Sequence, residues 1–97
     1  YFSKCDFLIN LTILALNINN IGDKGMEYFS NCNFLKNLEQ LFLYSNNISD
    51  NGIEYFCKCD FLISLTELNL DNNKSSKETT ISIISNNKKN FPKLIYP

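Results

Sequence analysis

Residues 10–38 read NLTILALNINNIGDKGMEYFSNCNFLKNL, and residues 37–65 repeat the pattern as NLEQLFLYSNNISDNGIEYFCKCDFLISL. Aligned without a gap, residues 11–37 and 38–64 share fourteen amino acids in the same order: Leu, Leu, Leu, Asn, Asn, Ile, Asp, Gly, Glu, Tyr, Phe, Cys, Phe and Leu. A third copy begins at Leu65. A period of this length is typical of repeat proteins, in which each unit buries its apolar face against its neighbours.

Within each copy, the spacing of the apolar residues changes from that of a strand to that of a helix. Three leucines at i, i+3 and i+5 open every copy: Leu11, Leu14, Leu16; Leu38, Leu41, Leu43; Leu65, Leu68, Leu70. The last two of each set alternate as in a short strand. An Asn-rich corner follows, and Asp23 or Asp50 fits a helix N-cap. Met26 and Phe29 then lie on one face of a short helix, as do their equivalents in the second copy.

The third copy departs from the pattern. Ser75 stands where the other copies have Ile, and Ser75 with Glu78 has the spacing of a capping box. The β-branched stretch TTISIIS, residues 79–85, would suit a strand by propensity, but the repeat register predicts a helix. Leu94 then takes the place of the leucine that opens a copy.

The pattern LxxLxLxxNxIxDxG, followed by an amphipathic segment, resembles the leucine-rich repeat, specifically its ribonuclease-inhibitor-like class. The resemblance is close over about residues 1–73 and loose beyond. It implies an α/β fold, a leucine-rich-repeat solenoid with parallel strands on the concave face and short helices on the convex face. The cysteine positions are near those in F-box substrate receptors, but those proteins carry Cys rather than Asn at the corner.

The expected organisation is a single leucine-rich-repeat segment, residues 1–97, and a fragment of a longer chain. Its parts are the tail of a repeat (1–10), two regular repeats (11–37 and 38–64), a divergent repeat (65–93) and the start of a further repeat or an end cap (94–97). Open ends of a repeat array expose apolar edges, so we expect this segment to need flanking repeats of the same chain.

The composition argues against several functional classes. Net charge is −1 with nine lysines and no arginine, so no basic surface for nucleic acid or an anionic membrane is expected. No apolar run is long enough to cross a bilayer. Histidine is absent, and no nucleophile–base pair, phosphate loop or metal cluster stands out. We therefore expect neither an enzyme nor a bound cofactor.

Four cysteines, Cys5, Cys32, Cys57 and Cys59, lie at or near the repeat period. Free cysteine is one of the residue types most often buried, which favours reduced thiols packed in the core. Without histidine, the pair at 57 and 59 is a weak zinc signal, and a disulfide between adjacent repeats stays open as an alternative. Reduced thiols favour an intracellular, cytoplasmic setting.

Asn19, Asn46 and Asn73 recur at the corner. Asparagine side chains can pair with backbone groups that a turn leaves without partners. The family resemblance implies a structural asparagine ladder inside the solenoid. Replacing Asn46 by alanine is then expected to cost roughly 1–3 kcal/mol, because buried groups lose their partners.

The positions beside the inward leucines differ between copies although the leucines agree. Alternation along a strand places them on the concave surface: Ile13, Ala15, Asn17, Gln40, Phe42, Tyr44, Glu67, Asn69 and Asp71. A constant framework with a varying surface suits recognition of a protein partner. Phe42 and Tyr44 are the best anchor candidates, because aromatic residues dominate interface hot spots.

The sequence thus predicts a protein–protein interaction module that binds its partner through the concave strand face. One alternative is a GTPase-activating or other GTPase-regulatory protein, because Ran GTPase-activating proteins resemble this repeat class at the level of fold. Others are a substrate receptor for ubiquitination and a structural component of a large assembly. The sequence leaves the partner unidentified.

Overall fold

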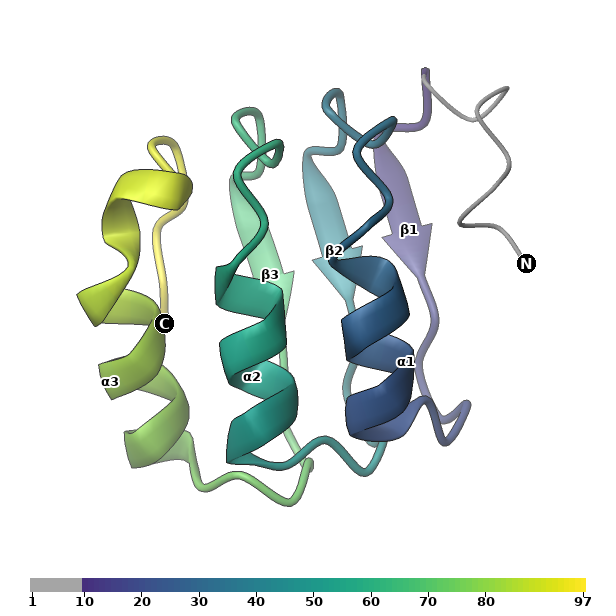
Figure 1. Cartoon of the computed structure of the whole chain (residues 1–97), viewed down its shortest axis with the longest axis vertical. Coiled ribbons are helices and arrows are strands. Elements are labelled where there is room, and N and C mark those ends of the chain that lie inside the picture. The colour runs from purple at the N-terminus through teal and green to yellow at the C-terminus, as the bar shows by residue number, and fades with distance from the viewer. Residues whose placement is uncertain (1–9) are drawn as a thin grey trace.

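The computed structural model describes residues 10–97 and arranges them as three strand-and-helix units lying side by side (Figure 1). In chain order the elements are β1 (Ile13–Ala15), α1 (Gly22–Phe29), β2 (Gln40–Phe42), α2 (Asp50–Cys57), β3 (Glu67–Asn69), α3 (Lys77–Asn86) and the short 3-10 helix η3 (Lys88–Asn90). The predictions that fall on residues 1–9, including the position of Cys5, lie outside the described residues.

The three strands form one open parallel sheet in the order β1-β2-β3. Leu14, Leu41 and Leu68 are direct partners in its register, so each repeat is displaced from the last by one strand. These leucines point to the same side because side chains alternate along a strand and the repeat length keeps their register. The strands of the predicted α/β fold are therefore present, parallel and in the expected register.

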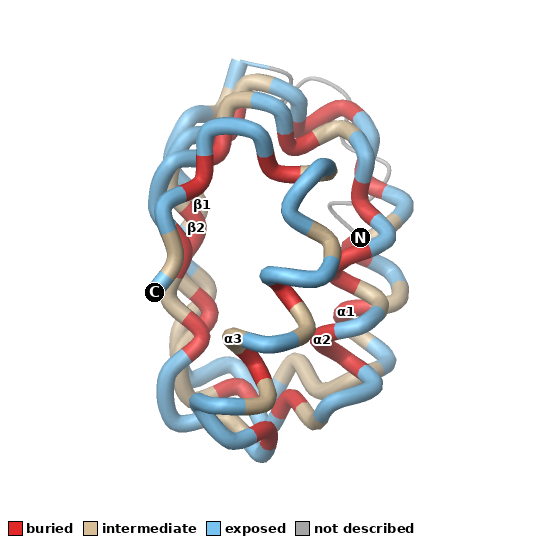
Figure 2. Tube along the Cα trace, turned by 90° about the vertical axis from the view of Figure 1, so that its left-hand side faces the viewer, coloured by how far each residue is buried: buried red, intermediate tan, exposed pale blue. Residues whose placement is uncertain are grey.

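The core lies between the sheet on one side and the helices on the other (Figure 2). The second unit is enclosed most completely, and Leu38, Leu41 and Ile48 have no exposed surface. Three phenylalanines, Phe29, Phe56 and Phe91, form a stack that we call the phenylalanine stack. Ring centroids are 6.2 Å apart in its first pair and 5.0 Å in its second, so the stack joins all three units.

The prediction that Asp23 and Asp50 are helix N-caps is wrong. Ile21 and Ser49 occupy the N-cap positions of α1 and α2 without a side-chain capping bond, and both aspartates lie in the first turn. The Asp23 carboxylate instead accepts hydrogen bonds from the backbone N–H of Ser49, at 2.7 Å, and from the Ser49 hydroxyl. An aspartate of one repeat thus holds the start of the next repeat's helix. A Cβ atom on Gly52 would lie 2.4 Å from this carboxylate, which explains the glycine.

Because the Asp23 carboxylate is bonded to Ser49, we expect the stability of the fold to depend on pH. Partial burial raises the pKa of Asp23, but hydrogen bonds from Ser49 and Gly52 outweigh it, so the pKa lies below its ordinary value of 3.8. A lowered pKa adds stability above the unfolded-state value, and that stability is lost as the pH falls through the folded-state value. We expect wild type to exceed Asp23→Asn in urea midpoint at pH 7, with the difference shrinking below about pH 3.8. An exposed control, Asp60→Asn, should show no such convergence, and a constant difference for Asp23→Asn would contradict the contact.

The divergent third unit forms a helix, as the register predicts, but its cap lies one residue later than expected. Ser76, rather than Ser75, is the N-cap of α3, and its hydroxyl accepts from the backbone N–H of Thr79 at 3.1 Å. Ser75 is buried and donates to the Asp50 carboxylate at 2.6 Å. An aspartate–serine contact between repeats therefore occurs a second time. Leu94 is buried like Leu38 and Leu65, which open the second and third units.

The corner of the first unit holds a residue in an unfavourable backbone conformation. Ile18 has φ +59°, and the equivalent positions Ser45 and Asn72 have φ +59° and +55°. Left-handed backbone suits Asn or Gly but crowds a β-branched side chain. Ile18 is also 72% exposed, so no core packing compensates for the strain.

Replacing Ile18 by asparagine is expected to stabilise the protein by about 1 kcal/mol, because asparagine tolerates the left-handed region. Thermal unfolding of the full chain would measure the gain. Ile95→Asn is the control, since Ile95 is 84% exposed and is not among the residues with positive φ. Equal effects of the two substitutions would show that lost surface apolarity, rather than backbone strain, determines the result.

The described cysteines, Cys32, Cys57 and Cys59, are free and buried, as predicted for core thiols. Burial raises the pKa of Cys57 to about 12, and burial also raises the pKa of Cys59 above its ordinary value. Both thiols are therefore protonated at neutral pH, which makes them poor nucleophiles and poor metal ligands.

Candidate functional site

All nine predicted binding positions lie on the side of the sheet away from the helices, and none of them is buried. We call this surface the sheet face. Strand register arranges its residues in rows that cross the strands: Ile13, Gln40 and Glu67 in the first; Ala15, Phe42 and Asn69 in the second; Asn17, Tyr44 and Asp71 just beyond the strands. The rows bring together residues that are 27 positions apart in the sequence.

The centre of the sheet face is aromatic. Phe42 and Tyr44 are both partly exposed and come from the middle unit. Their backbone is bonded to the first unit, because the carbonyl of Phe42 accepts from the N–H of Leu16 at 2.9 Å and the N–H of Tyr44 donates to the Asn17 side chain at 3.1 Å. The intervening N–H of Leu43 donates to the carbonyl of Asn69 in the third unit at 2.8 Å. The two rings are therefore presented to solvent from a fixed backbone, which reduces the entropy lost on binding.

The character of the sheet face changes from one strand to the next. At the β1 side it is apolar, with Ile13 53% exposed and Ala15 exposed beside it. At the β3 side it is acidic, with Glu67 and Asp71 both exposed. Its nine positions include no lysine.

The corner asparagines lie beneath one end of the sheet face. Asn46 is fully buried, and its side-chain oxygen accepts from the backbone N–H of Asn19 at 2.9 Å and of Ile21 at 3.3 Å. Its amide nitrogen donates to the carbonyls of Leu16, at 2.7 Å, and of Tyr44, at 3.3 Å. One side chain thus satisfies four backbone groups of two adjacent turns.

Asn73 makes the equivalent contacts one repeat later. Its oxygen accepts from the backbone N–H of Asn46 at 2.8 Å and of Ile48 at 3.0 Å, and its amide nitrogen donates to the carbonyl of Leu43 at 3.1 Å. Asn19 differs from the other two, because it is exposed and its amide donates to Asn17 of its own turn at 2.9 Å. Asn46 and Asn73 therefore fix the spacing between the turns that follow the strands, where Tyr44 and Asp71 lie.

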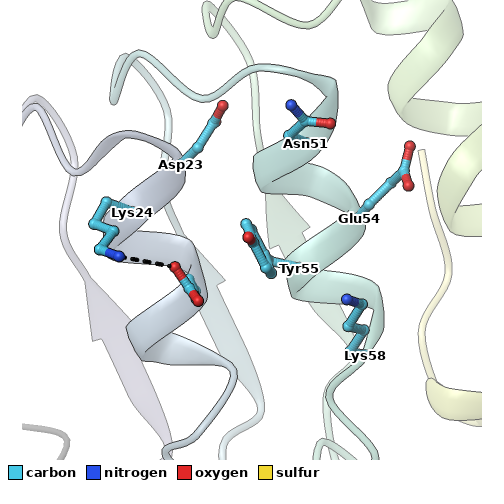
Figure 3. Close-up of a pocket in the computed structure, with 7 residues that line it drawn as sticks. Asp23, Lys24, Asn51, Glu54, Tyr55 and Lys58 are labelled. Carbon is cyan, nitrogen blue, oxygen red and sulfur yellow. Dashed lines mark ion pairs between the residues drawn. The ribbon is translucent and has the colours of Figure 1, made fainter.

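A pocket that the sequence did not indicate lies between α1 and α2 on the helix side (Figure 3). It has a volume of about 470 Å³ and is lined by Asp23, Lys24, Glu27, Asn51, Glu54, Tyr55 and Lys58. Lys24 lies 3.3 Å from Glu27, and the Lys58 ammonium lies 5.1 Å from the centre of the Tyr55 ring. Both ammonium groups of this pocket therefore already have partners within the protein.

Within residues 10–97, no group of three or more His, Cys, Asp or Glu residues could hold a metal ion. No helix in the same range combines the length and apolar character needed to cross a bilayer.

Ile18 lies beside the sheet face but is not among the nine predicted positions. Its backbone N–H donates to the carbonyl of Tyr44 at 3.1 Å, and its side chain is exposed.

Comparison with known proteins identifies the repeat. A protein-family model described as "Leucine Rich repeat" matches residues 8–30 and 34–57. The first segment contains β1 and α1, and the second contains β2 and α2, so each overlaps one of the two regular repeats. No curated protein and no solved structure gives a significant match to the chain.

Proposed function

We propose that this chain, which belongs to the leucine-rich repeat proteins, binds a protein partner through its sheet face. Repeats of this family generally mediate protein–protein interaction. The proposal also takes the stacked units to be part of a solenoid of the ribonuclease-inhibitor-like class, with the sheet face on its concave side.

The support for this proposal is the contrast between the inward and outward positions of the strands. The inward positions of the three strands are leucine in every unit, whereas the outward positions change chemistry from unit to unit, from Ile13 to Gln40 to Glu67 in the first row. The inward residues are fixed by packing, and the outward ones have no packing role that would explain their identities. Exposed aromatic residues at the centre of such a surface suit a binding hot spot.

A quantitative pull-down from native extract tests the proposal. We expect the full-length chain carrying Phe42→Asp and Tyr44→Ala to lose one partner selectively, because the substitutions place a charge and a gap at the centre of the sheet face. The matched control carries Tyr28→Asp and Ile63→Ala, which alter one exposed aromatic and one exposed aliphatic residue outside the sheet face. Folding of both variants is checked by thermal unfolding.

Retention of every partner by the sheet-face variant, with loss in the control variant, would place the interaction elsewhere. Retention by both variants would favour a structural component in which the sheet face is dispensable.

A further inference from the structure

The sheet face carries uncompensated negative charge on one side only. Within residues 10–97, neither Glu67 nor Asp71 takes part in an ion pair. Lys74, the lysine that follows them in the same unit, lies close enough to the Asp23 carboxylate to lower its pKa. That lysine therefore acts on the helix side of the corner. Lys77 lines a pocket with Asp71 but forms no ion pair with it, and both acids are exposed to solvent.

The opposite side of the same face is apolar. Ile13 and Ile18 are 53% and 72% exposed, which makes them two of the most exposed large apolar side chains in the described part of the chain. Two strand spacings of about 4.8 Å separate β1 from β3, so the apolar and acidic sides are about 10 Å apart. An extended chain covers that distance in about three residues.

We propose that the partner segment bound by the sheet face is basic at one end and apolar at the other. It places a lysine or arginine side chain against Glu67 or Asp71, and an aliphatic or aromatic side chain against Ile13 and Phe42. The two kinds of side chain are separated by two to four residues of the segment. This inference rests on the proposed function and adds the chemistry and the orientation of the partner.

Charge complementarity favours a partner segment with a basic end. An acidic segment would be repelled by two carboxylates that have no counter-ion on the sheet face, and like-charge contacts at an interface are strongly unfavourable. A purely apolar segment would remove water from both carboxylates without replacing the lost hydrogen bonds, which is also costly. A basic group can pair with one of the two carboxylates and lies within the negative field of the other, and the apolar side of the face adds burial.

A peptide selection tests the inference. A phage-displayed library of random dodecapeptides is panned against the full-length chain, and binders are then measured by fluorescence anisotropy with synthetic peptides. We expect selected peptides to be enriched in lysine or arginine two to four residues from an aliphatic or aromatic residue. Their affinity should fall about tenfold or more in a Glu67→Lys, Asp71→Lys variant, because attraction becomes repulsion.

The matched control is Glu54→Lys, Asp60→Lys, which changes the net charge equally with exposed residues outside the sheet face. It should bind the peptides within about twofold of wild type, since exposed charges beyond a Debye length are screened. Equal losses in the two charge-reversal variants would overturn the inference, as would selected peptides without basic residues or a selection that yields no binder.

The Phe42→Asp, Tyr44→Ala variant separates this inference from the function on which it rests. Peptides that lose binding to this variant but carry no basic residue would overturn the charge preference and leave the sheet face as the binding surface. Peptides that bind the variant as well as wild type would overturn both.

Discussion

Replacing Phe56 by alanine is expected to lower the free energy of unfolding by about 4 kcal/mol. Phe56 is fully buried, its ring stacks on Phe91 with centroids 5.0 Å apart, and it also packs against Phe29 of the preceding unit. Alanine would remove the ring from the middle of the phenylalanine stack and leave a cavity that touches all three units. Chemical denaturation of the full chain would measure the loss.

Phe42→Ala is the matched control, since it deletes the same ring from the sheet face. Phe42 is only partly buried, so we expect a cost below about 1 kcal/mol. Partner binding should show the reverse. Phe42→Ala should weaken binding, whereas Phe56→Leu, a milder core variant that still folds, should preserve it. Comparable losses of stability at the two positions would mean that the phenylalanine stack does not join the units as described.

Replacing Asn46 by alanine is expected to cost about 3 kcal/mol, at the upper end of what one buried polar side chain contributes. Its amide pairs with the N–H groups of Asn19 and Ile21 and with the carbonyls of Leu16 and Tyr44. Alanine would leave these four groups without their partner at the contact between two repeats. The shift of the urea midpoint would measure the cost.

Asn19→Ala provides the comparison, because it changes the same repeat position where the side chain is exposed and, within residues 10–97, bonds only to its own turn. Its cost is expected to stay below about 0.5 kcal/mol. An Asn46→Ala variant as stable as Asn19→Ala would show that water replaces the buried amide, and the corner asparagines would then have no special part in stability.

The strands and the core could be predicted from the sequence because the repeat supplies the register. A strand of three residues, such as Ile13–Ala15, is too short to recognise alone, but Leu14, Leu41 and Leu68 at the same place in three copies identify it. The same register correctly favoured a helix over TTISIIS, where β-propensity alone favours a strand. Tertiary packing outweighs local propensity in such a case.

The contacts between repeats could not be predicted from one repeat at a time. Aspartate is a preferred N-cap residue, but the Asp23 carboxylate binds Ser49 of the next unit, which comes close only when the units stack. The spacing of Ser75 and Glu78 predicts Ser75 as the cap of α3, but the helix begins one residue later, after Ser76. The partner of Ser75 is Asp50, which lies one repeat earlier in the chain.

For the candidate site, alternation along the strands predicts which residues point outward but not how they combine. The division of the sheet face into an apolar and an acidic side depends on the order of the strands, which places Ile13 and Glu67 on opposite sides of Gln40. The exposure of Ile18 was missed because its position in the corner follows no strand or helix period.

Site-specific photo-crosslinking in native extract tests the central claim most directly, because it reports which side of the molecule touches the partner. A benzophenone amino acid is placed at Phe42 on the sheet face or at Tyr28 on the helix side, where the tyrosine is 49% exposed. We predict a discrete crosslinked product with a protein partner from position 42 and none from position 28. A product from position 28 and none from position 42 would contradict binding through the sheet face.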